Sequence, residues 1–241
     1  MMLLSLVIKS KPKFWLFKIN YLPLYSNNKL NLYNMIVNKL QFPKFTGIKC
    51  NMMPFIQGDS SSLPDTYKPY AKIIDQHFLE KGEIGYLTID ESFVNAGQSQ
   101  RGYNNTGIDR NVHIEVGHHG DVKCWGGGGG SSWGGHGKTI LEDTTMVLIA
   151  NSISDTCRVW DAKEMRYTKD GDLSQYIDMY PEETGVMLKS GEVAKISIFT
   201  PHECINQTTP GKRQFMRIVG KGVTGREEYF TINPLMEEMC Y

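Results

Sequence analysis

The sequence predicts a mainly β protein, a sandwich or barrel of short strands preceded by one amphipathic helix. After residue 83, short runs with β-strand character follow one another and are separated by Gly, Asn, Asp, Ser and Pro. Strands do not alternate with long helices, so a doubly wound α/β fold is not expected. The predicted strands are 83–90, 111–116, 121–125, 145–151, 156–162, 192–200, 213–219 and 227–232.

One helix is expected before these strands. In "YAKIIDQHFLE", apolar side chains at Tyr70, Ile73, Ile74 and Phe78 recur with the period of an α-helix and form one stripe. His77 falls on the same stripe. We therefore expect His77 to be packed in the core rather than to bind a metal.

Composition divides the chain into two parts. Residues 1–50 contain eight lysines and no Asp, Glu or Arg, which predicts a basic and poorly ordered extension, with a targeting or surface-binding arm as the alternative. Residues 51–241 are expected to form a single β-rich domain. This part has 18 basic and 26 acidic side chains, so nucleic acid is not an expected partner.

The cysteines indicate a reducing compartment. They are Cys50, Cys124, Cys157, Cys204 and Cys240. An odd number, wide spacing and the lack of a C-x-x-C motif disfavour both a disulfide framework and a zinc ribbon. No apolar run approaches the roughly 20 residues of a membrane span, and the opening "MMLLSLVI" lacks the basic region of a signal peptide. A soluble, intracellular protein is expected.

A glycine-rich segment interrupts the strands. Eight glycines lie within 126–137, which predicts a flexible loop and, as an alternative, a lid over a nearby site. The ending "GKT" also invites comparison with a phosphate-binding loop, but Ser132 stands where that motif requires its first glycine.

Metal-ligand residue types occur in one short run and again far along the chain. His113 and Glu115 alternate along a predicted strand, so both side chains should lie on the same face. His202 follows Pro201 at the end of the apolar run "ISIFTP". Two histidines and one carboxylate can form a facial triad, which leaves coordination positions open on iron. Arg213, eleven residues after His202, could hold a carboxylate.

Two further histidines follow the first pair. His118 and His119 are expected in the turn after the strand, although a nitrogen-rich, zinc-like site is an alternative. His136 falls in the glycine-rich segment and is expected to be a loop residue.

The arrangement His-x-Asp/Glu, a distal His and an Arg about ten residues later resembles the 2-oxoglutarate- and iron(II)-dependent oxygenases. The resemblance covers about residues 83–232 and implies a double-stranded β-helix, the jelly-roll fold shared with cupins. It implies that His113, Glu115 and His202 bind iron and that Arg213 binds the far carboxylate of 2-oxoglutarate. Glu115 departs from the pattern, since Asp is commoner there.

The resemblance implies a dioxygenase, and the acidic body favours a small-molecule or protein substrate. The first alternative is a non-catalytic jelly-roll or β-sandwich module for binding or assembly. In that case His113 and Glu115 would form a surface pair, and Arg213 would meet an acid such as Glu203. The second alternative is a metal-dependent cupin enzyme without a cosubstrate, although the H-x-H opening of many cupins is lacking.

Overall fold

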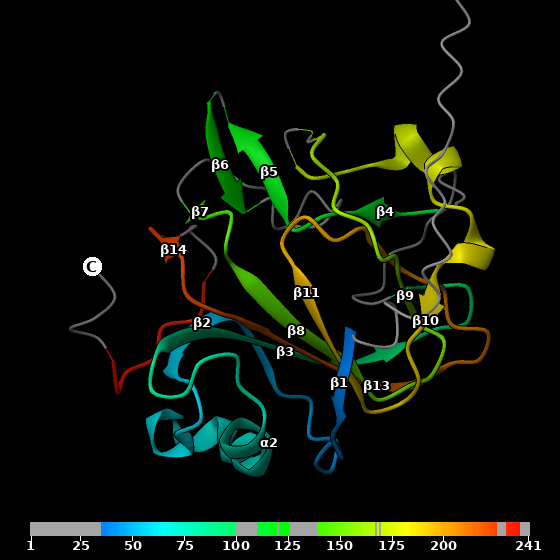
Figure 1. Ribbon diagram of the computed structural model, residues 1–241. Helices are drawn as coiled ribbons and strands as arrows, with labels where there is room; N and C mark the ends of the chain where they lie inside the picture. Colours follow the sequence, from blue (N-terminus) through cyan, green and yellow to red (C-terminus); the bar gives the residue numbers. More distant parts are fainter. Residues whose placement is uncertain are drawn as a thin grey trace, which may run out of the picture.

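The computed structural model describes residues 35–99, 110–119, 121–125, 139–166, 168, 170–225 and 230–236. Within these ranges the protein is mainly β, with three antiparallel sheets and one short α-helix (Figure 1). The predicted flexible loop or lid at 126–137, which includes His136, lies outside the described residues.

The largest sheet, sheet A, has six strands. In spatial order they are β1 (Ile36–Lys39), β11 (Glu192–Ser197), β8 (Met146–Asn151), β13 (Gly211–Val219), β3 (Ile84–Val94) and β2 (Lys49–Ile56). The nine residues of β13 pair along their whole length with β3, from Gly211 opposite Val94 to Val219 opposite Tyr86. This long pairing fixes which side chains of β13 face each side of the sheet.

Two four-stranded sheets complete the described fold. Sheet B has the order β10 (Val186–Met187), β9 (Cys157–Val159), β12 (His202–Cys204) and β4 (Val112–His113). Sheet C has the order β14 (Val223–Thr224), β7 (Ile140–Leu141), β6 (Val122–Trp125) and β5 (Val116–His119). The short 3-10 helices are Ser60–Ser62, Asp65–Tyr70, Ser174–Met179 and Glu182–Thr184.

Sheet A has an apolar core on each face, because alternate side chains along its strands point to opposite sides. On one face, Met216 and Ile218 of β13 share a core cluster with Ile73 and Ile74 of α2 (Ala71–Gln76). Figure 1 shows α2 beneath this face. The other face shares a second cluster with sheet B, which includes Phe215 of β13. Arg213 and Arg217 lie on the same face of β13 as Phe215. The side chains of both arginines therefore point into the interior between sheets A and B.

The predicted helix is present but short. The α-helix itself has six residues, and a 3-10 helix over Asp65–Tyr70 precedes it. His77 is buried as predicted, and burial lowers its pKa. Phe78, by contrast, is 37% exposed, because the helix ends before it and the apolar stripe is not continued.

Four strand predictions need correction. The run 156–162 is too long, because β9 ends at Val159 and residues 160–162 form no strand. The run 111–116 is divided between β4 in sheet B and β5 in sheet C. The run 192–200 is too long, because β11 ends at Ser197 and a turn follows, with the Thr200 N–H bonded to the Ser197 carbonyl. At the end of the chain, residues 230–232 form no strand, and 227–229 lie outside the described residues.

The edge strands come from the start of the described chain. The strand β1 and the first residues of β2 lie within residues 1–50, the region for which the sequence predicts an extension. Cys50 is buried in the core cluster around α2. Among the described residues, no helix is long and apolar enough to cross a membrane.

Candidate functional site

Sheet B brings His113 and His202 together from positions 89 residues apart in the sequence. The two are direct partners across β4 and β12, and their ring centroids lie 4.2 Å apart. Each side chain is buried, with a relative exposure of 5%. Sequence alternation predicted a shared face for His113 and Glu115, and the strand pairing adds His202 to the same interior.

The backbone fixes the protonation of both imidazoles. Nδ1 of His113 lies 2.9 Å from the carbonyl oxygen of Asn111, and Nδ1 of His202 lies 2.9 Å from that of Thr200. A carbonyl oxygen only accepts hydrogen bonds, so Nδ1 carries the proton in each ring and a neutral ring keeps its lone pair on Nε2. Burial, reinforced by the neighbouring imidazole of His202, lowers the pKa of His113 to about 3. His113 is therefore neutral at physiological pH.

Glu115 joins the histidines from the connection between β4 and β5. Its backbone N–H donates to the Ile198 carbonyl, and its Oε1 lies 3.6 Å from Nε2 of His202. Burial by itself would raise the pKa of this carboxyl group. The positive charge of Arg217 more than offsets that effect and holds the pKa of Glu115 well below its usual range.

Arg217 is a part of the site that the sequence analysis missed. Its Nη1 lies 3.2 and 3.3 Å from the two carboxylate oxygens of Glu115, and its guanidinium carbon lies 4.3 Å from the ring centroid of Trp125. Nη2 donates to the hydroxyl of Thr88 at 3.4 Å. The available signal was the spacing of Arg213 and Arg217, which places them on the same face of one strand.

Arg213 lies on the same inner face of β13 but has a different partner. Its Nη2 donates to Oδ1 of Asn151 at 2.5 Å, and the side chain is 1% exposed. Within the described residues, Nε and Nη1 of Arg213 and Nδ2 of Asn151 are buried without a hydrogen-bond acceptor. Burial lowers the pKa of Arg213. A buried cation with two N–H donors that have no acceptor among the described residues is suited to bind an anionic ligand.

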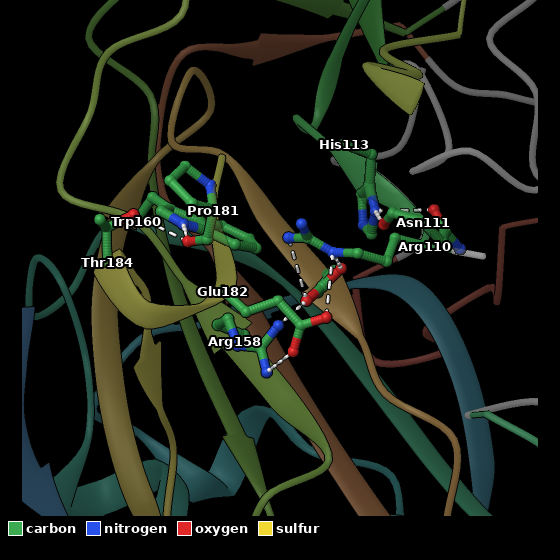
Figure 2. A network of polar contacts seen from close by, with 9 residues as sticks. Arg110, Asn111, His113, Arg158, Trp160, Pro181, Glu182 and Thr184 are labelled. Atoms are coloured by element: carbon green, nitrogen blue, oxygen red, sulfur yellow. Dashed lines mark hydrogen bonds and ion pairs between the residues drawn. The ribbon is translucent and has the colours of Figure 1, made fainter. Parts of the chain in front are cut away.

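Glu203, the acid that the alternative assigned to Arg213, belongs to another network. Its carboxylate accepts from Nε of Arg110 at 3.0 Å and from Nη1 of Arg158 at 2.5 Å. Arg158 also donates to Glu182, at 2.8 Å. Figure 2 shows Arg110, Arg158 and Glu182 converging, with Trp160 alongside. Since Glu203 follows His202 directly, it lies on the opposite face of β12.

The remaining histidines of the run have a different position from the one predicted. His118 and His119 lie in β5, where they pair with Lys123 and Val122 of β6, and not in a turn. The connection between β5 and β6 has only two residues, so His118 and His119 belong to the strand of this hairpin.

The donor types fit a divalent ion, although a complete cluster is not formed. No group of three or more His, Cys, Asp and Glu side chains is positioned to hold a metal in the part of the chain that the structure describes. Two imidazoles with Nδ1 held by a backbone carbonyl and an ionised carboxylate nevertheless match an iron- or zinc-binding set. Arg217 engages both oxygens of Glu115, so a metal would have to take one of them from this ion pair.

No family model, curated protein or solved structure matches this chain. The functional argument therefore depends on the residues of the site.

Proposed function

We propose that this protein is an iron(II)- and 2-oxoglutarate-dependent oxygenase with a double-stranded β-helix fold. The observation that carries the proposal is the pair of buried histidines, His113 and His202. Their Nδ1–H groups are satisfied by backbone carbonyls, which leaves both Nε2 lone pairs for the interior next to Glu115. Ligating histidines commonly have this second hydrogen bond, because it fixes the tautomer and the orientation of the ring.

The order of the strands supports the proposed fold. Sheet A contains the order β11-β8-β13-β3, and sheet B has the order β10-β9-β12-β4. Apart from the step from β9 to β10, the chain crosses from one of these arrays to the other at each successive strand. Such interleaving is typical of eight-stranded jelly rolls built from two Greek keys.

Arg213 and Asn151 supply the proposed cosubstrate site. Together they have three buried nitrogen atoms without an acceptor among the described residues, and a carboxylate provides two acceptor oxygens. The ligand's negative charge would compensate the buried guanidinium, and the surrounding core would exclude water. Bound iron would supply dioxygen activation, and 2-oxoglutarate would supply the electrons for it.

The substrate class follows from charge. Beyond residue 50 the chain has an excess of acidic side chains, which favours a small molecule or a protein side chain over nucleic acid.

A non-catalytic binding module is the second candidate, and the ion pair between Arg217 and Glu115 favours it. In such a module Glu115 would neutralise Arg217 permanently, and Arg213 would bind an anion without any metal. A cupin enzyme without a cosubstrate would instead bind metal with an affinity that 2-oxoglutarate does not change.

The test combines metal analysis with a turnover assay. The protein is loaded with iron(II) without oxygen, desalted and analysed for iron, and succinate formation from 2-oxoglutarate is then measured in air. We expect about one iron per chain and slow succinate formation in the absence of the substrate. His202→Ala should lose both, and Arg213→Met should lose succinate formation while keeping iron.

His118→Ala is the matched control, because it removes a histidine of the same run from β5. It should keep both iron and activity, and circular dichroism checks that every variant is folded. Equal iron in His202→Ala and the unmodified protein would refute the metal site. Anion binding at Arg213 without any iron would establish the binding module instead.

A further inference from the structure

Cys157 and Cys204 face each other on neighbouring strands of sheet B. They are direct partners in the pairing of β9 with β12. On either side of this pair, the Ile205 N–H donates to the Thr156 carbonyl and the Trp160 N–H donates to the Pro201 carbonyl, each at 3.0 Å. Hydrogen-bonded and non-hydrogen-bonded pairs alternate along an antiparallel ladder, so the cysteines form a non-hydrogen-bonded pair.

The pairing of β9 with β10 also indicates that Cys157 and Cys204 form a non-hydrogen-bonded pair. The carbonyl of Cys157 accepts from the N–H of Leu188, just beyond β10, and therefore points away from Cys204. In a non-hydrogen-bonded pair the Cα atoms are about 4.5 Å apart, at the short end of the range of about 4.4–6.8 Å found in disulfides. The Cβ atoms of such pairs are about 4.5–5.5 Å apart, so a bond requires the two strands to approach by about 1 Å.

The two thiols differ in accessibility. Cys157 is buried, and burial raises its pKa well above the usual range. Cys204 is partly exposed. An external oxidant would therefore meet Cys204 first, and Cys157 would react within the protein.

We propose that Cys157 and Cys204 are a modification site, which forms a reversible cross-strand disulfide when a small disulfide such as oxidised glutathione is present. The sulfur of Cys204 attacks one glutathione sulfur, and the other glutathione leaves as a thiol. The sulfur of Cys157 then displaces the second glutathione from Cys204. Two protein thiols and one oxidised glutathione give one protein disulfide and two glutathione thiols, which carry the two protons.

The disulfide would change the interior of the protein near His202 and Arg213. Cys204 lies two residues after His202 on β12 and so faces the same side. Both thiols interact electrostatically with the guanidinium of Arg213. The disulfide would draw β12 toward β9 at this point and alter the surroundings of both residues. The chemical modification itself does not depend on the proposed oxygenase function.

The experiment treats the protein with increasing ratios of oxidised to reduced glutathione, followed by acid quenching and alkylation of the remaining thiols. Mass spectrometry should show the loss of two hydrogens, and peptide mapping should join Cys157 to Cys204. Reduction with dithiothreitol should restore both thiols. Cys204→Ser should abolish the linkage, and because Cys204 is partly exposed this variant is expected to fold.

Cys124→Ser is the matched control, since Cys124 lies in sheet C, and it should leave the linkage unchanged. A Cys240→Ser variant tests pairing with the cysteine that lies outside the described residues. A persistent mixed disulfide of glutathione with Cys204, a linkage to any other cysteine, or full alkylation of both thiols after oxidation would each overturn the proposal.

Discussion

Replacement of Arg213 by methionine should make the protein more stable and unable to bind 2-oxoglutarate. Arg213 is 1% exposed, and its guanidinium donates a hydrogen bond to Oδ1 of Asn151. Nε and Nη1 have no acceptor within the described residues. A buried charge in this condition is unfavourable for folding, since its hydration is lost without full compensation.

The expected magnitude follows from these atoms. Each buried donor without an acceptor costs about 1–3 kcal/mol, and Arg213→Met removes two of them. The same change leaves Oδ1 of Asn151 without its donor, which returns about 1–2 kcal/mol of the gain. The net range is about 0–5 kcal/mol, and within it we expect the free energy of unfolding to rise by about 1–4 kcal/mol, as when buried ionic groups are replaced by apolar side chains of similar size.

Urea unfolding with and without 2-oxoglutarate measures both effects. At a ligand concentration 100 times its Kd, the unmodified protein should gain about 2.7 kcal/mol, and Arg213→Met should gain nothing. Lys212→Met is the control, because it removes an exposed cation from the adjacent position. A loss of more than about 2 kcal/mol in Arg213→Met would refute the reasoning, since it would mean that the guanidinium is already compensated in the free protein.

Two further substitutions test other buried polar side chains. Asn151→Asp should neutralise Arg213 internally, raise stability and abolish the stabilisation by 2-oxoglutarate, which the same urea titrations measure. Glu164→Gln should cost about 1–2 kcal/mol at neutral pH, since burial would raise the pKa of Glu164 but Arg166 and Tyr180 lower it from 4.5 to about 2. Ionised Glu164 adds its full contribution to the free energy of unfolding above pH 4.5, and this contribution disappears as the pH falls toward 2. In unfolding measurements between pH 3 and 7, the variant should therefore be less stable by a constant amount above pH 4.5 and by a smaller amount below it.

The sequence predicted the mainly β fold because alternating and apolar runs report strands directly. It did not predict which sheet a strand joins. The run through His202 is an example: it reads as one strand, but β11 ends at Ser197 in sheet A and β12 begins at His202 in sheet B. The residues between them make a tight turn, in which the Ser197 N–H donates to the hydroxyl of Thr200. Such a turn is fixed by tertiary contacts that periodicity does not report.

The same limit applies to the site. Spacing selected His113, Glu115 and His202 as candidate ligands, and the structure brings them to one interior because β4 pairs with β12. The spacing of residues in the sequence could not identify Arg217 as the partner of Glu115. An arginine on a strand has the same sequence pattern whether it faces a carboxylate or solvent. Asn151 was missed for the same reason, since it lies in β8, which neighbours β13 in sheet A but comes 62 residues before Arg213 in the sequence.

Arg217 decides whether the interior favours an ion pair or a metal, and Arg217→Gln separates the two. Glutamine keeps a donor for Glu115 but removes the positive charge, which opposes a divalent ion bound to the same carboxylate. A positive charge that shares its carboxylate partner with a divalent ion would cost on the order of 1–5 kcal/mol, so iron or manganese should bind roughly tenfold more tightly to the variant. Anaerobic titration measures the affinity, and Lys212→Gln controls for the loss of a charge elsewhere. Weaker binding would contradict this and would mean that Arg217 positions Glu115 for the metal.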